Sequence, residues 1–433
     1  MQLQWREESV SVYAGGGIAH PTVSTADTCL AWQYRPSGPA LSYSVLMLFV
    51  ALLYSQLPTL LPILEVVRPV YAVGGVAMLV VVIEKMLSRQ GFEIVWPQTY
   101  LVVAFLAAAG FSCLNAVWMR YAVDNTLDLV KMVTLYFIII NAVNNIGRLR
   151  GLLWVMVVGG LCPAIGSLWN YSQGQMIEGR ANWIGIFMNP NELAYSLVIL
   201  IPLAGCLAAT VSTRIAALLW AIVAIYIAAI YVSFSRGGML GLLVVLAVSS
   251  LRWKRAAPRV LTLALLAGAV AWSAYGWSRQ EGFGQLGTDA TIHQRVTTIR
   301  AGLAMFADHP IFGVGLGSSV VAWPLYAPSD AYGDKWLVTH NTFVQALSET
   351  GIIGFLLFVL LLGTSLYDAK TMTKGDQAHA TLAIGVELSL WAFVVCGLSG
   401  GFLLSWFPYI LIGLVSALKQ IGQERSRPTP CVQ

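Results

Sequence analysis

Long apolar runs recur along almost the whole of this 433-residue chain, and they constrain its fold more than any single motif does. Hydrophobic residues make up 58% of the sequence and charged residues only 10%. A helix needs about 20 mostly apolar residues to cross about 30 Å of hydrocarbon, where backbone groups find no partner except one another. The composition therefore predicts an all-α integral membrane protein.

Apolar runs bounded by charges and by Gly, Pro or Asn predict twelve transmembrane helices. The expected spans are 41–57, 59–83, 98–118, 127–144, 149–169, 191–210, 214–234, 237–251, 258–277, 341–366, 379–398 and 401–418. Residues 1–40 lack the apolar stretch of a signal peptide, so we expect a cytoplasmic tail there. Residues 419–433 are the expected C-terminal tail, and 41–418 one membrane domain without an internal repeat.

The positions of Lys and Arg predict the orientation of these spans. With the N-terminus inside, 16 of the 25 basic residues fall in inner loops and tails, and seven fall in outer loops. Cytoplasmic loops are the ones that carry excess positive charge. Both termini are therefore expected inside, and residues 278–340 become a long periplasmic loop between spans nine and ten.

This loop contains a predicted helix. Five apolar residues fall on one face at helical spacing: Ile292, Val296, Ile299, Leu303 and Phe306. Arg295 and Arg300 flank that face on opposite sides, as in a helix that lies on a membrane interface. The two arginines are candidates to hold a pyrophosphate, although the same pattern is typical of ordinary headgroup binding.

Three spans begin on the outer side with polar strings. These are Asn189-Pro190-Asn191-Glu192, Ser235-Arg236-Gly237-Gly238 and His340-Asn341. A helix N-terminus offers free N–H groups and the positive end of its dipole, so three converging N-termini predict an anion site. Arg236 adds a guanidinium that grips phosphate oxygens in pairs, unless it only anchors its helix at the headgroups.

His340 is the expected general base. An imidazole at the headgroup level has the polar end of a lipid-linked molecule as a natural partner, and nearby arginines favour the neutral form that accepts a proton. Asn341 is expected to orient the ring, and Gly351 and Gly354 to let a neighbouring helix approach. The alternative is a histidine that only caps its helix.

The remaining polar residues have structural interpretations. Glu192 is expected to cap span six. Glu349 and Glu387 are expected to pair with Lys131, Arg68 or another buried polar group, and a catalytic role for either one is the alternative. All six cysteines are expected to be free thiols. The net charge of +5 follows the inner-loop bias and does not indicate nucleic acid. There is no Walker A string, Asp-x-Asp pair or His/Cys cluster, so no cofactor or metal is expected.

Four strings together resemble the O-antigen ligase family, within a superfamily that also holds O-antigen polymerases and protein O-oligosaccharyltransferases. They are Asn189 to Ala194, Ser235 to Gly238, His309-Pro310-Ile311-Phe312-Gly313-Val314-Gly315, and His340-Asn341 followed nine residues later by Gly351-Ile352-Ile353-Gly354. The resemblance covers about 180–366. The last string is similar to the ligases in particular.

The resemblance implies a glycosyltransferase of the bacterial inner membrane with a periplasmic active site. It would move O-antigen polysaccharide from an undecaprenyl pyrophosphate donor to a lipid A-core acceptor, without metal and with inversion at the anomeric carbon. His340 would be the base, and Arg236 and Arg295 would bind the pyrophosphate. From position alone, we add Arg180, Arg300, Asn189, Asn191 and Asn341 as substrate-binding residues.

Other functions stay open at this point. A polymerase or a protein O-oligosaccharyltransferase would use the same donor with a different acceptor. A transporter or flippase of lipid-linked sugar is less favoured, because transporters place functional charges at the bilayer midplane in broken, repeated helices.

Overall fold

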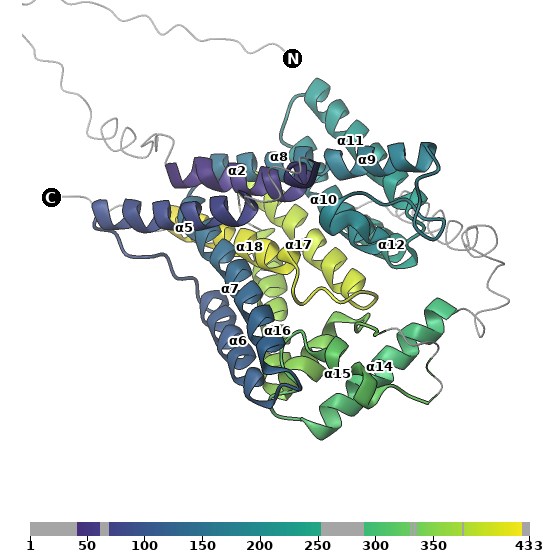
Figure 1. Cartoon of the computed structure of the whole chain (residues 1–433). Coiled ribbons are helices and arrows are strands. Elements are labelled where there is room, and N and C mark those ends of the chain that lie inside the picture. Colours follow the sequence, from purple (N-terminus) through teal and green to yellow (C-terminus); the bar gives the residue numbers. More distant parts are fainter. Residues whose placement is uncertain are drawn as a thin grey trace, which may run out of the picture. The chain divides into compact units, whose positions relative to one another are not determined.

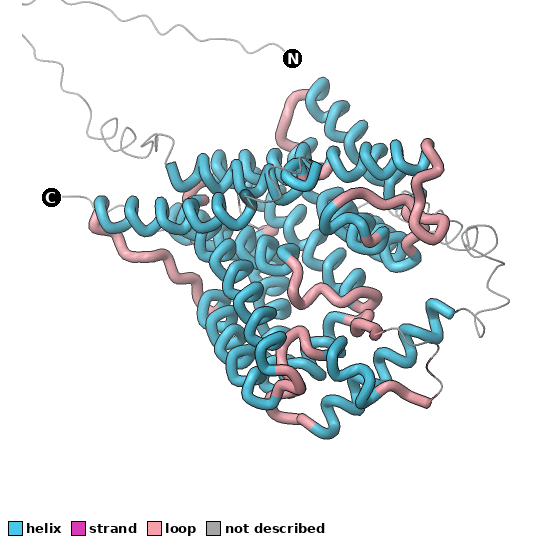
Figure 2. The backbone as a smooth tube through the Cα atoms, in the orientation of Figure 1, coloured by secondary structure: helices cyan, strands magenta, loops and turns pink. Residues whose placement is uncertain are grey.

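Helices account for all the regular structure in the described parts of the chain, apart from a single bridge between Ile177 and Arg180 (Figure 2). The computed structural model describes residues 41–60, 69–252, 290–329, 331, 336–374 and 376–426. The expected N-terminal tail, span nine at 258–277, loop residues 278–289 and residues 427–433 lie outside these ranges. The all-helical prediction is confirmed for the described residues.

Figure 1 labels most of the helices in chain order. Their bounds are α2 Leu41–Ser55, α3 Leu57–Leu60, α5 Pro69–Leu87, α6 Gln98–Ser112, η1 Cys113–Asn115, α7 Met119–Ala142, α8 Ile146–Gly159, α9 Leu161–Ser172, η2 Gly185–Met188, α10 Pro190–Ala208, α11 Thr213–Val232, α12 Arg236–Leu251, α14 Ala290–Asp308, α15 Ser319–Tyr326, α16 Thr342–Met372, α17 Gln377–Gly397 and α18 Trp406–Ser426.

Seven helical segments among the described residues are long and apolar enough to cross a membrane. They are Pro69–Leu87, Gln98–Asn115, Ile146–Ser172, Pro190–Ala208, Thr213–Val232, Thr342–Met372 and Gln377–Gly397. The helices α2 and α12 are apolar but shorter. Several membrane-spanning helices are therefore present, and the full count of twelve stays a prediction.

Some boundaries differ from the prediction for a local reason. The helix α7 begins at Met119, eight residues before the expected start. The prediction left Arg120 and Asp124 outside the span because they are charged, but both lie on the exposed side of the helix. The last helix begins at Trp406 and not at 401, because the residues before it form a turn. The second expected span is interrupted: α3 ends at Leu60, residues 61–68 are not described, and α5 starts at Pro69.

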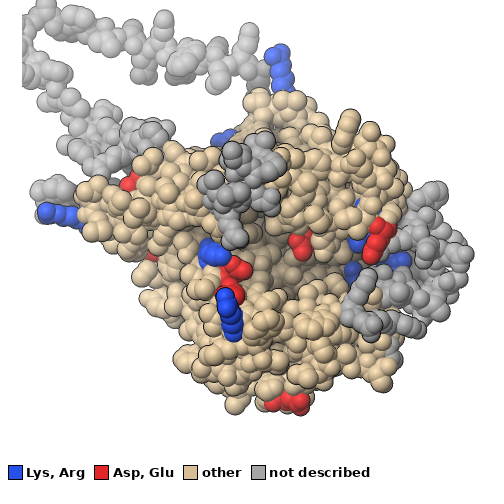
Figure 3. All heavy atoms as spheres, in the orientation of Figure 1, with Lys and Arg blue, Asp and Glu red and all other residues tan. Residues whose placement is uncertain are grey.

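Apolar side chains cover much of the outer surface, as lipid contact requires. Along α5, Leu79 and Met86 are 58% and 73% exposed, and only Ala77 and Val81 are buried. Figure 3 shows a face on which most of the described surface carries no charged side chain. A soluble protein rarely leaves so much contiguous apolar surface open, so lipid is the natural solvent for these faces.

The helix α16 is broken at Gly351, where φ is +64° and ψ is −168°. Two rings on either side of the break, those of Phe343 and Phe358, lie only 6.3 Å apart. In a straight helix fifteen residues would separate them by about 22 Å. Residues 342–350 therefore form a short helix that folds back on the longer one, and His340 does not stand at the mouth of one continuous span.

A loop at 309–317 fills the break. The backbone N–H groups of Val314 and Gly315 donate to the carbonyl oxygens of Ser348 and Glu349, at 2.9 and 3.1 Å, and Ile352 donates to Pro310 at 2.8 Å. A Cβ atom on Gly351 would lie 2.3 Å from the Ile311 carbonyl oxygen. This glycine thus accommodates a loop and not the neighbouring helix that was expected.

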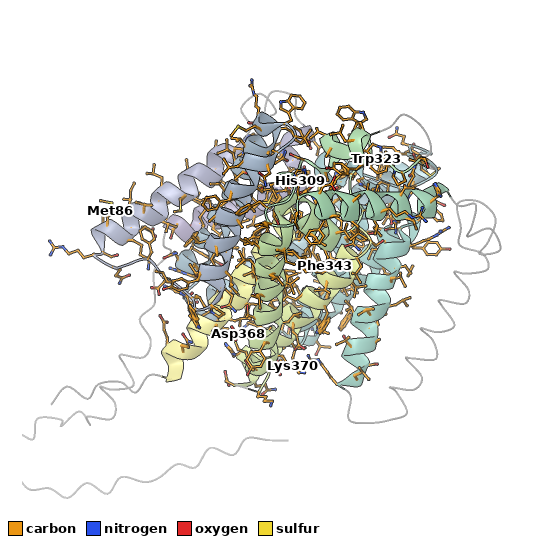
Figure 4. The ribbon with its side chains drawn as sticks, turned by 90° about the horizontal axis from the view of Figure 1, so that it is seen from below. Met86, His309, Trp323, Phe343, Asp368 and Lys370 are labelled. Atoms are coloured by element: carbon orange, nitrogen blue, oxygen red, sulfur yellow. The ribbon has the colours of Figure 1, made fainter. Side chains whose placement is uncertain are left out.

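The side chain of Glu349 holds the same loop in place by hydrogen bonds. This fully buried carboxylate accepts hydrogen bonds from the Ser319 hydroxyl at 2.6 Å, from the Gly317 N–H at 2.9 Å and from the Gln345 amide at 3.2 and 3.3 Å. Of the partners predicted for Glu349, a buried polar group is the one observed, because three hydrogen-bond donors and not Lys131 satisfy this carboxylate. In Figure 4, His309, at the start of the loop, lies in the upper part of the view, and Asp368, far along α16, lies in the lower part.

Gly351→Ala tests the break. We expect it to lower the stability of the protein by at least about 2 kcal/mol, because this φ/ψ region is almost restricted to glycine and the loop backbone leaves no room. The matched control is Gly363→Ala in the same helix, where nothing lies within 4 Å of the added atom. Thermal unfolding in detergent micelles measures both. Equal midpoints for the two variants would contradict this account of the break.

The predicted loop helix exists as α14, but its packed face differs from the expected one. Thr298, Ala301 and Gly302 face the protein, whereas Val296 and Leu303 from the apolar stripe are 42% and 47% exposed. Small residues let α14 approach closely: a Cβ atom on Gly302 would lie 2.6 Å from Val344. The apolar stripe is left for lipid, as an interfacial helix requires. The second loop helix, α15, was not predicted.

Candidate functional site

The starts of α10 and α12 are joined by Arg180. This arginine is 5% exposed, and its guanidinium donates to the Ser233 carbonyl oxygen at 2.9 Å and to the Asn191 side-chain oxygen at 2.6 Å. The Ser235 hydroxyl donates to the same Asn191 oxygen at 2.9 Å. Arg180 and Asn191 therefore hold two helix starts together, and their predicted contact with substrate stays a prediction.

Side-chain caps occupy part of the helix N-termini. Asn189 accepts from the Asn191 N–H at 2.9 Å, Ser235 from Gly238 at 3.2 Å, and Asn341 from Phe343 and Val344 at 2.9 and 3.1 Å. These four N–H groups therefore have partners within the protein. The predicted anion site would depend on the other first-turn N–H groups, the helix dipoles and the arginines, and it stays a prediction. Asn189, and not Glu192, supplies the cap of α10.

A turn at residues 398–403, between α17 and α18 (yellow in Figure 1), joins all three of these helix starts. The Asn341 amide donates to the Leu398 carbonyl oxygen at 3.2 Å, and the Thr342 hydroxyl donates to Gly400 at 2.7 Å. The hydroxyl of Tyr195, in α10, donates to the carbonyl oxygen of Ser399 at 3.1 Å. We call these residues the 398–403 turn.

The start of α12 touches the 398–403 turn through a glycine. A Cβ atom on Gly237 would lie 2.5 Å from the Ser399 hydroxyl oxygen and 2.2 Å from that of Tyr195. Any larger residue would push these groups apart, so the absence of a side chain at Gly237 is what permits the contact. Arg236 precedes this glycine directly and is half-buried.

Arg295 reaches the same point from α14. Its guanidinium Nη1 donates to the Ser399 hydroxyl oxygen at 2.7 Å. Arg295 lies at the edge of the packed face of α14, seven residues before Gly302, whereas Arg300 lies on the exposed face. The two arginines of the loop helix therefore lie on different sides of α14, and the predicted contact of Arg300 with substrate stays a prediction.

The positive charge of Arg295 acts on the imidazole of His340. Burial, and then the positive charge of Arg295, lower the pKa of His340 from 6.5 to about 4. The imidazole is therefore neutral at physiological pH, as predicted, and a nitrogen lone pair is available to accept a proton. Asn341 uses its side chain to cap α16 and to hold Leu398, so those bonds, and not contact with the ring, are what the structure gives this residue.

Sequence reasoning missed Ser399, Tyr195 and Gln345 in this region. Each is an ordinary residue in an apolar chain, and only its contacts make it notable. The one local signal was the pair Gly400-Gly401 after Ser399, which permits a tight turn. Gln345 accepts from the Leu403 N–H at 3.4 Å and donates to Glu349, so it links the 398–403 turn to the 309–317 loop.

The other predicted polar contacts have different partners. Lys131 pairs with Asp128 at 2.6 Å and lies over the Tyr71 ring, and Glu387 pairs with Arg252. Lys131 lines a cavity of about 620 Å³ between α2, α5, α7 and α18, which contains none of the predicted site residues. Arg68 lies outside the described residues.

Two chemical predictions concern metals and thiols. Within the described ranges, no three His, Cys, Asp or Glu side chains gather as metal ligands would. The four described cysteines, Cys113, Cys162, Cys206 and Cys396, are free thiols as predicted, and Cys29 and Cys431 lie outside those ranges.

The fold and this polar site within it define a multi-helix membrane protein with several helices able to span the bilayer. Residues 221–359 match the family model described as O-antigen ligase, which supports membership of the chain in the O-antigen ligase/polymerase superfamily. The match lies inside the region that carried the motif resemblance and includes Arg236, Arg295 and His340. No curated protein gives a significant match. The match covers about a third of the chain, and its description makes an enzyme of the ligase or polymerase type, acting on lipid-linked glycan, the function to be tested.

Proposed function

We propose that this protein is an O-antigen ligase, which transfers O-antigen polysaccharide from undecaprenyl pyrophosphate to a sugar hydroxyl of lipid A-core. The observation that carries the proposal is geometric: the 398–403 turn binds Arg295 directly and contacts the helix starts that carry His340 and Arg236. A base and an arginine in one place suit a reaction that takes a proton from an alcohol and releases an anion.

The reaction runs as a single displacement. His340 takes the proton of the acceptor hydroxyl as its oxygen forms a bond to the anomeric carbon of the donor sugar. The bond from that carbon to the pyrophosphate oxygen breaks, and the undecaprenyl pyrophosphate leaves with the electron pair. Arg236 and Arg295 bind the charge that develops on the leaving oxygen. Attack from the side opposite the leaving group inverts the anomeric carbon.

Donor binding strengthens the base in this scheme. A pKa near 4 makes the free imidazole a weak proton acceptor, since efficient general bases have a pKa near the working pH. A bound pyrophosphate places negative charge beside Arg295 and offsets the effect of that arginine on His340. The pKa of His340 therefore rises when the donor is in place.

This scheme predicts a specific pH dependence. His340 is active only when neutral, so the rate falls as the pH drops through its pKa. We expect the acidic limb of kcat/KM, which reports the free enzyme, to lie near pH 4 and not near 6.5. The acidic limb of kcat, which reports the bound complex, lies higher. A kcat/KM limb at 6.5 in initial-rate measurements would contradict the environment described for His340.

The setting of the reaction is part of the proposal. The active site faces the periplasm, and the chain lies in the inner membrane, because that orientation puts 16 basic residues inside and seven outside. The partners are the lipid-linked donor, the lipid A-core acceptor and the surrounding lipids. No metal ion takes part in this scheme.

A reconstituted assay tests the function. Purified protein in liposomes, with defined undecaprenyl-linked glycan and lipid A-core, is expected to form linked product without ATP or added metal. A polymerase would instead lengthen the glycan on its carrier, and a transporter would move it across the bilayer unchanged. Either of these results in place of linked product would refute the ligase assignment.

A further inference from the structure

Ser399 occupies a junction that the proposed reaction does not yet explain. Its hydroxyl oxygen accepts from Arg295 Nη1 at 2.7 Å and from the Tyr195 hydroxyl at 3.1 Å, while its backbone carbonyl oxygen also accepts from Tyr195. It therefore connects α10 and α14, which are far apart in the sequence. Serine has one short side chain with a single staggered torsion, so it fixes its hydroxyl closely.

Arg295 needs such an anchor. An arginine side chain samples many rotamers when it is free, and α14 is held to the protein by its small-residue face near Gly302, two turns further along. The bond to Ser399 is the contact that fixes the guanidinium. Without it the α14 backbone would stay in place while the charged group moved.

The same turn holds the other two residues of the proposed reaction. The Thr342 hydroxyl donates to Gly400 at 2.7 Å and accepts from the Phe402 N–H at 2.9 Å, which fixes the start of α16 next to His340. The contact of Gly237 with the Ser399 hydroxyl fixes the start of α12 next to Arg236. The 398–403 turn thus contacts Arg295 directly. It also contacts Asn341, next to His340, and Gly237, next to Arg236.

We propose that Ser399 is a positioning residue of the transfer reaction, and that the 398–403 turn sets the arrangement of Arg295, His340 and Arg236. This inference rests on the proposed function. Ser399 itself contacts neither donor nor acceptor in the proposal. It acts through Arg295, and its loss changes where that charge lies.

The test is Ser399→Ala in the reconstituted full-length protein. We expect kcat to fall about tenfold to a hundredfold, because displacing a reacting group by about 1 Å has effects of this size. The acidic limb of kcat/KM is expected to move up from near pH 4 but to stay below 6.5, because the charge of Arg295 is displaced from His340 while burial, the larger cause of the lowered pKa, remains. Of the charged groups described, Arg295 is the one whose field acts on that ring. The matched control is Ser405→Ala, whose hydroxyl has one hydrogen-bond partner among the described residues, the nearby Phe402 carbonyl oxygen at 2.8 Å.

A double-mutant cycle separates positioning from a general structural defect. If Ser399 acts through Arg295, Ser399→Ala has little further effect in an Arg295→Ala background, whereas independent effects would multiply. If Ser399→Ala does not fold, Tyr195→Phe replaces it: that change keeps the ring that lies 4.9 Å from Phe402 and removes only the hydroxyl. We expect a reduced kcat and an upward pH shift there too.

The outcomes distinguish the two proposals. Wild-type protein that transfers glycan, with Ser399→Ala equal to Ser405→Ala in rate and pH limb, would overturn the positioning role and leave the proposed function standing. Multiplying effects in the double mutant would overturn it as well. Wild-type protein that transfers no glycan at all would refute the proposed function first.

Discussion

His340→Ala is expected to reduce glycan transfer by about a hundredfold to ten-thousandfold, the usual contribution of a positioned general base. The substitution removes the proton acceptor but no buried contact that holds the helices together, since Asn341 and Thr342 make the bonds that fix the start of α16. The protein should therefore insert and purify normally. Product formation from defined donor and acceptor measures the effect.

A second variant separates base catalysis from hydrogen bonding. His340→Gln keeps a polar side chain that donates and accepts hydrogen bonds but does not take up a proton in this pH range. We expect it to be as inactive as His340→Ala. Wild-type transfer by either variant would show that another group takes the proton, and smooth lipopolysaccharide in cells that carry only the variant would show the same.

Arg295→Ala is expected to lower kcat by about a hundredfold to a thousandfold, the loss seen when one donor to a developing anion is removed. Arg236→Ala should have an effect of similar size, because both guanidinium groups are proposed to hold the same pyrophosphate. For Arg295→Ala we also expect the acidic limb of kcat/KM to move up, since its charge helps to lower the pKa of His340. Single-turnover kinetics with lipid-linked donor measure these effects.

The control for both arginines is Arg214→Ala. Arg214 is exposed in the first turn of α11, and no predicted site residue lies on that helix. Its loss should leave transfer unchanged. Equal, small losses in all three variants would mean that general basic charge, and not the two proposed arginines, supports activity.

The sequence predicted the helices of this protein well because the signals are local. Apolar length decides whether a segment such as 213–232 or 377–397 becomes a helix that suits lipid, and flanking residues such as Asn189 and Ser235 decide where a helix begins. The motifs at Arg236 and His340 were found in the same way, since they stand at the ends of apolar runs.

The break in α16 was not predicted from hydropathy, and the reason is physical. Residues 341–366 were predicted as one apolar span, but Gly351 adopts a backbone conformation that only its contact with the 309–317 loop requires. The carbonyl groups freed at the break are satisfied by N–H groups from that loop, some 35 residues earlier in the chain. No periodicity within the helix records such a partner.

Apolar length and helix caps depend on residues that are close together in the sequence. The sequence alone therefore determines that the protein is a helical membrane protein with polar residues at the helix starts. The tertiary structure alone decided what those starts surround. Ser399 became the junction of Arg295 and Tyr195, and Glu349 became the anchor of a loop, through hydrogen bonds between distant segments. Such bonds depend on which surfaces the packed helices bring together, and that information is not carried by any one stretch of sequence.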